Sequence, residues 1–270
     1  MSEGARARSL LEDILEHTRR SVDDEKRRCP LHELQAAARR APATRSFAAA
    51  LSRPGRVNVI AEHKRRSPSR GSIREDLSPA DVARRYEAAG AAALSVLTDE
   101  AYFGGNLAQL GEARASVGLP VLRKDFVVDP WQVWQARAAG ADALLLIVAA
   151  LADDALRRLL ATAGEAGIET LVEVHDAAEL ARALDAGAPI VGVNNRDLAT
   201  LRVSLETSLA LAPAIPDGVV AVAESGIRSG RDVSALRAAG FDAFLVGEHL
   251  MSAADPGAAL RLLIEEAGAA

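Results

Sequence analysis

The sequence predicts a closed barrel of eight parallel β-strands, each followed by a helix, which is an α/β fold of the (β/α)8 type with an N-terminal helical extension. Three observations predict it. Short apolar segments alternate with helical segments from about residue 57 onward. The short segments are continuously apolar, as expected when both faces of a parallel sheet are buried. A weak repeat, Ala-Ala-Gly-Ala or a close variant, precedes four of the strands and indicates a recurring passage from helix to strand.

The helical extension comes first in the chain. Apolar residues at helical spacing between about 9 and 51 predict three helices, the second of which begins after Pro30. Arg53-Pro54-Gly55 is a turn and marks the start of the barrel. We expect a single domain over 1–270, in which 1–55 is an extension that packs over the mouth of the barrel.

Eight strands are predicted after this turn, near 57–63, 93–97, 120–124, 142–148, 169–174, 189–194, 219–224 and 242–246. Helices are predicted near 79–89, 106–117, 130–139, 152–166, 176–186, 204–212, 229–239 and 256–267. A doubly wound open sheet is the alternative, but it usually carries a glycine-rich loop after its first strand. Here the first strand leads into Lys64-Arg65-Arg66-Ser67, so we favour the barrel.

Composition excludes several classes of protein. The 270 residues are 49% apolar and 26% charged, which is an ordinary globular mixture, and the net charge is −5. The single cysteine, Cys29, excludes a disulfide within the chain and a cysteine-rich zinc site. No apolar run reaches the ~18 residues needed to span a bilayer, and the N-terminus shows no signal core, so we expect a cytoplasmic protein with no membrane partner. No basic block lies beside aromatic residues, which argues against a nucleic-acid partner.

The basic residues are distributed unevenly between the two types. Only three of the 32 are lysines, at Lys26, Lys64 and Lys124. Composition bias explains the abundance of arginine. A lysine ammonium can lose its proton when its surroundings lower the pKa, whereas a guanidinium practically cannot. The retained lysines are therefore candidates for proton transfer.

Polar residues end several of the predicted strands, and in such a barrel the active site lies at those C-terminal ends. Because side chains alternate between faces, Glu62 and Lys64 share one face, while His63 takes the other and is expected to be a hydrogen-bonded core histidine. Ser225-Gly226 and Gly247-Glu248, after the seventh and eighth strands, predict a phosphate site made of backbone N–H groups. Five strand ends together bring these polar residues to one rim: Lys64, Lys124, Glu173, Asn194, Arg196 and Glu224.

These motifs, in this order, resemble the indole-3-glycerol phosphate synthase family over nearly the whole chain. One departure is His63, where the family usually has a small or apolar residue. The resemblance rests on the segments 29–34, 47–51, 62–71, 94–100, 102–105, 122–126, 171–176, 194–198, 223–227 and 246–251.

The resemblance implies an activity. The substrate 1-(2-carboxyphenylamino)-1-deoxyribulose 5-phosphate undergoes ring closure, loss of carbon dioxide and loss of water to give indole-3-glycerol phosphate, with no metal and no cofactor. Lys124 matches the family's general acid at ring closure, and Glu173 and Lys64 match further acid–base groups. The resemblance also implies Glu62 beside Lys64, Asn194 and Arg196 at the anthranilate end, Ser67 at its carboxylate, Phe103, Phe126 and Leu145 around the aromatic ring, Glu224 as a substrate contact, and Ser225, Gly226, Gly247 and Glu248 at the phosphate.

Two alternatives remain open. Another phosphate-sugar barrel, such as phosphoribosylanthranilate isomerase, often pairs a cysteine with an aspartate, and this chain has no cysteine at a strand end. A non-catalytic barrel that binds a phosphorylated ligand is expected to have lost some of its charged strand ends, yet Lys64, Lys124, Glu173 and Asn194 are all present. We expect a small phosphorylated anthranilate-sugar as the ligand, while association with other enzymes of tryptophan biosynthesis does not follow from the sequence.

Overall fold

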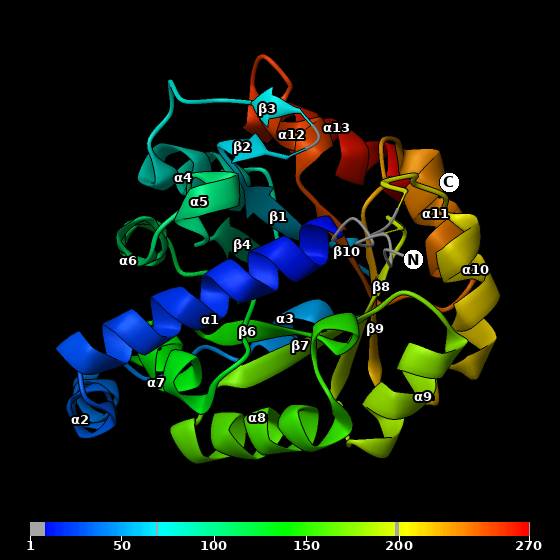
Figure 1. Ribbon diagram of the computed structural model, residues 1–270. Coiled ribbons are helices and arrows are strands. Elements are labelled where there is room, and N and C mark those ends of the chain that lie inside the picture. Colours follow the sequence, from blue (N-terminus) through cyan, green and yellow to red (C-terminus); the bar gives the residue numbers. More distant parts are fainter. Residues whose placement is uncertain (1–8, 69, 198–199, 270) are drawn as a thin grey trace, which may run out of the picture.

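The computed structural model describes residues 9–68, 70–197 and 200–269 and confirms the closed barrel (Figure 1). Its eight parallel strands close in the order β1-β10-β9-β8-β7-β6-β5-β4. Ser69 and Leu198, which belong to two of the motifs above, lie outside the described residues. In the described ranges, no helix combines the length and the apolar character needed to cross a membrane.

Each predicted strand and helix of the barrel is confirmed, with ends that differ by no more than two residues. The barrel strands are β1 Asn58–His63, β4 Ala93–Leu97, β5 Val121–Lys124, β6 Ala143–Ile147, β7 Glu169–Val174, β8 Ile190–Asn194, β9 Val220–Glu224 and β10 Ala243–Val246. The helices around them are α4 Pro79–Ala88, α6 Leu107–Ser116, α7 Pro130–Ala138, α8 Asp153–Ala166, α9 Ala177–Asp185, α10 Glu206–Leu211, α11 Gly230–Ala238 and α13 Pro256–Gly268.

The backbone conformation at the ends of these helices explains why the Ala-Ala-Gly-Ala repeat marks the passage from helix to strand. At the C-terminal end, Gly90 and Gly140 have φ angles of 95° and 90°, a conformation that strains residues with a Cβ. The chain then turns directly into the next strand. At the N-terminal end, a polar side chain accepts hydrogen bonds from the first turn at Ser78, Asn106, Asp129, Asp176, Ser229 and Asp255.

Several short elements lie in the loops and were not predicted. β2 Arg66–Ser67 and β3 Gly71–Ser72 form an antiparallel hairpin after β1, and α5 Glu100–Phe103 follows β4. Two 3-10 turns occur at η1 Val148–Ala150 and η2 Ala212–Ala214. Elements of two to four residues are too short to show a hydrophobic period, which is why the sequence pattern missed them. The short helix expected at Gly247-Glu248 is present as α12 Glu248–Met251.

The barrel interior is apolar toward its closed end and charged toward its mouth. Apolar side chains of all eight barrel strands pack with α3 Phe47–Leu51 in one buried cluster. Side chains that face the interior recur every second residue, and the next interior position along four of the strands is a glutamate or a lysine. Ile60 is followed by Glu62, Leu122 by Lys124, Leu171 by Glu173, and Val222 by Glu224.

The helical extension contacts both ends of the barrel. α3 closes the end opposite the mouth, because Phe47 and Leu51 are fully buried in the interior cluster. The side chain of Asn58, at the start of β1, donates a hydrogen bond of 2.7 Å to the Leu51 carbonyl. α1 Leu10–Arg28 crosses the barrel diagonally (Figure 1), and its first turns line a small cavity at the mouth. Among the described helices of the extension, α1 lies over the mouth and α3 lies at the opposite end, whereas we expected the whole extension over the mouth.

The C-terminal half of α1, with α2 Leu31–Arg40, is attached to α7. Val22, Leu34 and Trp131 form a separate buried cluster. The indole N–H of Trp131 donates to the Cys29 carbonyl at 2.9 Å, and the Lys26 ammonium lies 2.5 Å from the Asp129 carboxylate. These contacts fix one end of α1 to the helix layer.

His63 differs from the prediction in one respect. It is buried, with 4% of its surface exposed, but its Nε2 has no hydrogen-bond partner in the described part of the chain. The hydrogen bond that we expected is therefore absent at that atom. Burial, with a smaller effect from Arg65, lowers the pKa of His63 to about 4, so the ring is neutral at pH 7.

We predict that Phe47→Ala destabilises the protein by about 3–5 kcal/mol, because it removes a fully buried ring from the closed end of the barrel. Urea denaturation followed by far-UV circular dichroism measures the change. Leu262→Ala is the matched control: this leucine is 56% exposed on α13, so its effect should stay within about 0.5 kcal/mol. Equal midpoints for the two variants would show that α3 does not support the barrel.

Candidate active site

A cavity of about 610 Å³ opens at the C-terminal ends of the barrel strands. A second, smaller cavity of about 130 Å³ adjoins it under α1, and Lys64, Phe103, Phe126, Arg196 and Glu248 line both. Every predicted site residue except Ser67 lines the larger cavity, and Ser67 lines the smaller one. The structure therefore brings all the predicted residues together, including those from β1, β5, β7, β8, β9 and β10.

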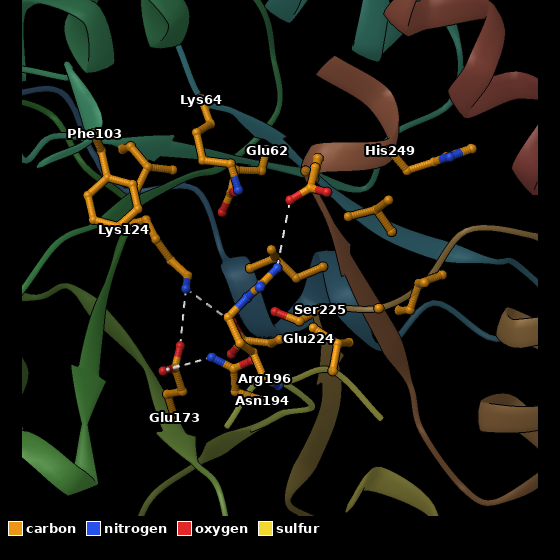
Figure 2. Close-up of a pocket in the computed structure, with 18 of the residues that line it drawn as sticks. Glu62, Lys64, Phe103, Lys124, Glu173, Asn194, Arg196, Glu224, Ser225 and His249 are labelled. Atoms are coloured by element: carbon orange, nitrogen blue, oxygen red, sulfur yellow. Dashed lines mark hydrogen bonds and ion pairs between the residues drawn. The ribbon is translucent and has the colours of Figure 1, made fainter. Parts of the chain in front are cut away.

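The Lys124 ammonium lies between two buried glutamates (Figure 2). Its Nζ is 3.1 Å from Glu173 Oε2 and 3.2 Å from Glu224 Oε2, and only 15% of the lysine side chain is exposed. Burial alone disfavours the charged form. The attraction of Glu173, Glu224 and Glu62 outweighs it and holds the pKa of Lys124 well above its usual value. Lys124 therefore carries a proton throughout the neutral range.

The two glutamates beside Lys124 differ in charge. Burial would raise the pKa of Glu173, but Lys124, His175 and Asn194 stabilise its ionised form and hold that pKa well below the usual range. Burial raises the pKa of Glu224 to about 8, and neighbouring Glu173 adds to the rise against the attraction of Lys124. Two carboxylates share one ammonium, so one of them keeps its proton at neutral pH.

Hydrogen bonds explain which glutamate is ionised. Glu173 Oε1 accepts a hydrogen bond of 3.1 Å from the Asn194 amide, and Oε2 accepts one from Lys124. Neither oxygen of Glu224 has a hydrogen-bond partner in the part of the chain that the structure describes, although Lys124 lies within ion-pair distance. A carboxylate that accepts hydrogen bonds is stabilised in its charged form, so Glu173 ionises first.

A second ion pair lies at the end of β1. The Lys64 ammonium is 2.9 Å from Glu62 Oε1, and the Ser95 hydroxyl donates to the other oxygen of Glu62 at 3.4 Å. Burial opposes ionisation of Glu62, but Lys64 and then Lys124 lower its pKa below the usual value. Glu62 is thus a buried carboxylate that links both lysines of the cavity.

The predicted phosphate end is built from backbone that approaches its neighbours closely. Ser225 and Gly226 have φ angles of 66° and 82°, so the loop after β9 turns sharply. A Cβ on Gly247 would lie 2.4 Å from a carboxylate oxygen of Glu62, so only glycine fits there. These residues line the cavity, and α12 starts at Glu248.

The predicted carboxylate-binding end contains two unexpected ion pairs, both with Glu248. Arg196 Nη2 lies 3.7 Å from Glu248 Oε2, and Arg70 Nε lies 3.0 Å from the other oxygen of Glu248. The Glu248 side chain thus links the loops after β1 and β8 across the mouth. No local sequence pattern predicts these contacts, because they join residues of three separate loops.

Other residues that line or border the site were not predicted. Arg70, Asp99, Asp125, Arg228 and His249 line the larger cavity. His175, two residues after Glu173, lies with its Nε2 3.4 Å from Glu173 Oε1. Strand alternation could have identified His175, because residues two apart share a face. In the described residues, no group of three or more His, Cys, Asp or Glu side chains is arranged to hold a metal ion.

Comparisons with known proteins identify relatives of this chain. A sequence model of the indole-3-glycerol phosphate synthase family matches residues 11–263. An indole-3-glycerol phosphate synthase of Acidithiobacillus ferrooxidans is 52% identical over 257 residues, covering 94% of this chain and 98% of that protein. One of Aromatoleum aromaticum is 53% identical over 237 residues, covering 87% and 90%.

Solved structures with low sequence identity share the fold alone. A mandelate oxidase variant with an FMN adduct superposes with a TM-score of 0.59 and 22% identity, covering 88% of this chain and 93% of that one. Thiamine phosphate pyrophosphorylase from Pyrococcus furiosus gives a TM-score of 0.58 and 17% identity, covering 78% and 95%.

We predict that Glu224→Gln makes the protein more stable relative to wild type as the pH rises from 5 to 9. The pKa of Glu224 is about 8 in the folded protein and about 4.3 for an unfolded glutamate. The folded state therefore binds the extra proton between these values, and wild-type stability falls as pH rises through them. Thermal midpoints measured across this range test the prediction.

Glu265→Gln, which changes an exposed carboxylate on α13, is the control and should follow the wild-type pH dependence. A constant difference between Glu224→Gln and wild type at every pH would show that Glu224 is already ionised at neutral pH.

Proposed function

This chain belongs to the indole-3-glycerol phosphate synthase family, and we propose that Lys124, Glu173 and Lys64 carry out the proton transfers of that family's reaction. The reaction closes the indole ring of 1-(2-carboxyphenylamino)-1-deoxyribulose 5-phosphate and releases carbon dioxide and water. The observation that carries the proposal is the buried Lys124 ammonium held between Glu173 and Glu224 in the cavity. The family assignment also supports a cytoplasmic location.

Ring closure requires an acid. The ring carbon that bears the carboxylate attacks the ribulose carbonyl, and negative charge develops on the carbonyl oxygen. Lys124 is protonated and faces the cavity, so it donates a proton to that oxygen as the bond forms. The product of this step carries a hydroxyl, and loss of carbon dioxide then restores the aromatic ring.

Dehydration requires an acid and a base. The hydroxyl leaves as water after it gains a proton, and a ring carbon loses a proton to form the double bond. Glu173 is ionised and serves as the base. Lys64 is held beside the cavity by Glu62 at 2.9 Å and serves as the acid. Asn194 positions Glu173 through the 3.1 Å hydrogen bond described above.

The two ends of the cavity fit the two ends of the substrate. Phe103 and Phe126, with ring centroids 6.3 Å apart, and Leu145 provide apolar walls for the aromatic ring. The backbone N–H groups of Ser225, Gly226, Gly247 and Glu248 bind the phosphate. Arg196 and Ser67 bind the substrate carboxylate. Because Arg196 lies 3.7 Å from the carboxylate of Glu248, the substrate can replace Glu248 as the partner of Arg196.

The activity itself is tested by incubating the purified protein with the anilino-ribulose phosphate and following the fluorescence of the indole product. Product formation supports the synthase. Isomerisation of phosphoribosylanthranilate without indole formation would favour the isomerase, and binding without turnover would favour a non-catalytic barrel. No indole product at high enzyme concentration would overturn the proposal.

We predict that Lys124→Arg lowers kcat by roughly 10²–10⁴-fold, the range lost when a general acid is removed. Arginine keeps the positive charge but does not release its proton, so phosphate binding should survive, as measured by competitive inhibition with inorganic phosphate. Lys26→Arg is the matched control, because Lys26 pairs with Asp129, the residue that caps α7, and lies outside both cavities. Turnover near the wild-type rate in Lys124→Arg would refute the acid role.

A further inference from the structure

A largely buried histidine lies beside Glu173 and lines neither cavity. His175 follows the end of β7 and shares a face with Glu173. Its side chain is 13% exposed, and its two ring nitrogens face two different carboxylates. Nε2 lies 3.4 Å from Glu173 Oε1, and Nδ1 lies 3.0 Å from Glu179 Oε2.

Glu179 is fixed by the first turn of α9. Its backbone N–H donates to the side chain of Asp176, the residue that caps this helix, at 2.8 Å. Its side-chain Oε2 accepts a hydrogen bond of 2.8 Å from the backbone N–H of His175. Because an ionised carboxylate only accepts hydrogen bonds, the 3.0 Å contact places a proton on Nδ1 of His175.

The position of that proton constrains the other ring nitrogen. If the ring were neutral, Nε2 would present its lone pair to the Glu173 carboxylate, and two acceptors would face each other in a buried site. Nε2 has no hydrogen-bond partner among the residues that the structure describes. A proton on Nε2 removes the repulsion and places a cation between two carboxylates.

We propose that His175 is a positioning residue that is an imidazolium at neutral pH, is held by Glu179, and keeps Glu173 ionised and oriented toward Lys124. Glu173 then accepts hydrogen bonds from Lys124 on one oxygen and from Asn194 on the other. The positive charge of His175, 3.4 Å from that second oxygen, adds to them. The inference rests on the proposed function for its catalytic consequence, which is that Glu173 enters the reaction as a base.

The charges around His175 agree with this assignment. Burial disfavours the imidazolium, but Glu173 and Glu179 outweigh it and raise the pKa of His175 to about 10. The neighbouring elements β6, β8 and η1 contain no titratable side chain. On α8 and α9, Asp153 pairs with Arg182, and Arg157 pairs with Asp185. Lys124, on β5, is held on the other oxygen of Glu173.

The ionisation of His175 can be measured without any substrate. In the ¹⁵N-labelled full chain, both ring nitrogens of His175 should show imidazolium chemical shifts at pH 8, with the signals assigned by their loss in His175→Gln. Glu179→Gln keeps an acceptor oxygen but removes the charge, so the pKa of His175 should fall by at least about one unit. Asp81→Asn, which changes an exposed acidic residue in the first turn of α4, is the matched control and should leave the His175 signals unchanged.

The catalytic consequence is tested by the pH dependence of turnover. In Glu179→Gln, kcat should fall as pH rises through the lowered pKa of His175, whereas wild type and Asp81→Asn should not show this loss below pH 9. In His175→Gln, kcat should fall about tenfold, as expected when one charge-assisted contact is lost. KM should change less than twofold in both variants, because neither side chain lines a cavity. A purely structural role would instead lower the thermal midpoint without moving the pH profile.

Neutral His175 at pH 8 in wild type would overturn the proposal whatever the activity. An unchanged pH profile of kcat in a Glu179→Gln protein whose His175 pKa has fallen would overturn the positioning role. If Glu179→Gln fails to fold, the wild-type titration and the kcat of His175→Gln still decide. If no indole product forms with wild type, the proposed function fails, while the titration of His175 still tests its ionisation.

Discussion

The Lys124 ammonium, buried between Glu173 and Glu224, is the interaction on which the rest of the site depends. A charge taken out of water must be compensated by opposite charge and hydrogen bonds. Here the compensating groups come from β7 and β9, on strands that are not neighbours of β5 in the sheet. Only the closure of the barrel brings these strand ends around one lysine, so the fold itself is a condition for the charge state of the site.

Because side chains alternate between faces along each strand, the apolar side chains that pack the barrel interior and the charged side chains of the cavity form two successive layers. Each strand that supplies a charged group also supplies an apolar residue two positions earlier, as Leu122 precedes Lys124. The apolar layer is packed at the closed end by Phe47 of α3, and the cavity at the open end is bordered by the first turns of α1. Water is thereby excluded at the closed end and limited at the open end, which strengthens every electrostatic interaction of the charged layer.

The sequence predicted the barrel elements and the meeting of the site residues, because both depend on local patterns. Continuous apolar runs mark parallel strands, and a polar residue at the end of such a run must lie at the mouth. The features that the sequence did not predict depend on contacts between segments that are distant in the chain. The pairing of Glu248 with Arg70 and Arg196, and the place of α3 at the closed end, follow from packing that no local pattern records. The same holds for Nε2 of His63, which has no hydrogen-bond partner among the described residues, because such an absence leaves no pattern in the sequence.

The scarcity of lysine in this chain now has a more exact meaning. Lys64 and Lys124 lie in the cavity, each within 3.2 Å of a buried glutamate. Lys26, however, also makes a close ion pair, with Asp129 at the N-terminal cap of α7, and lines neither cavity. Retention of a lysine, or even its pairing with an acid, therefore does not by itself mark a proton donor. The distinguishing condition is the strand end: there a buried ammonium faces several carboxylates and a cavity that admits a reactant. Under that condition, loss and recovery of one proton changes the charge balance of every neighbour, which arginine at the same place would not permit.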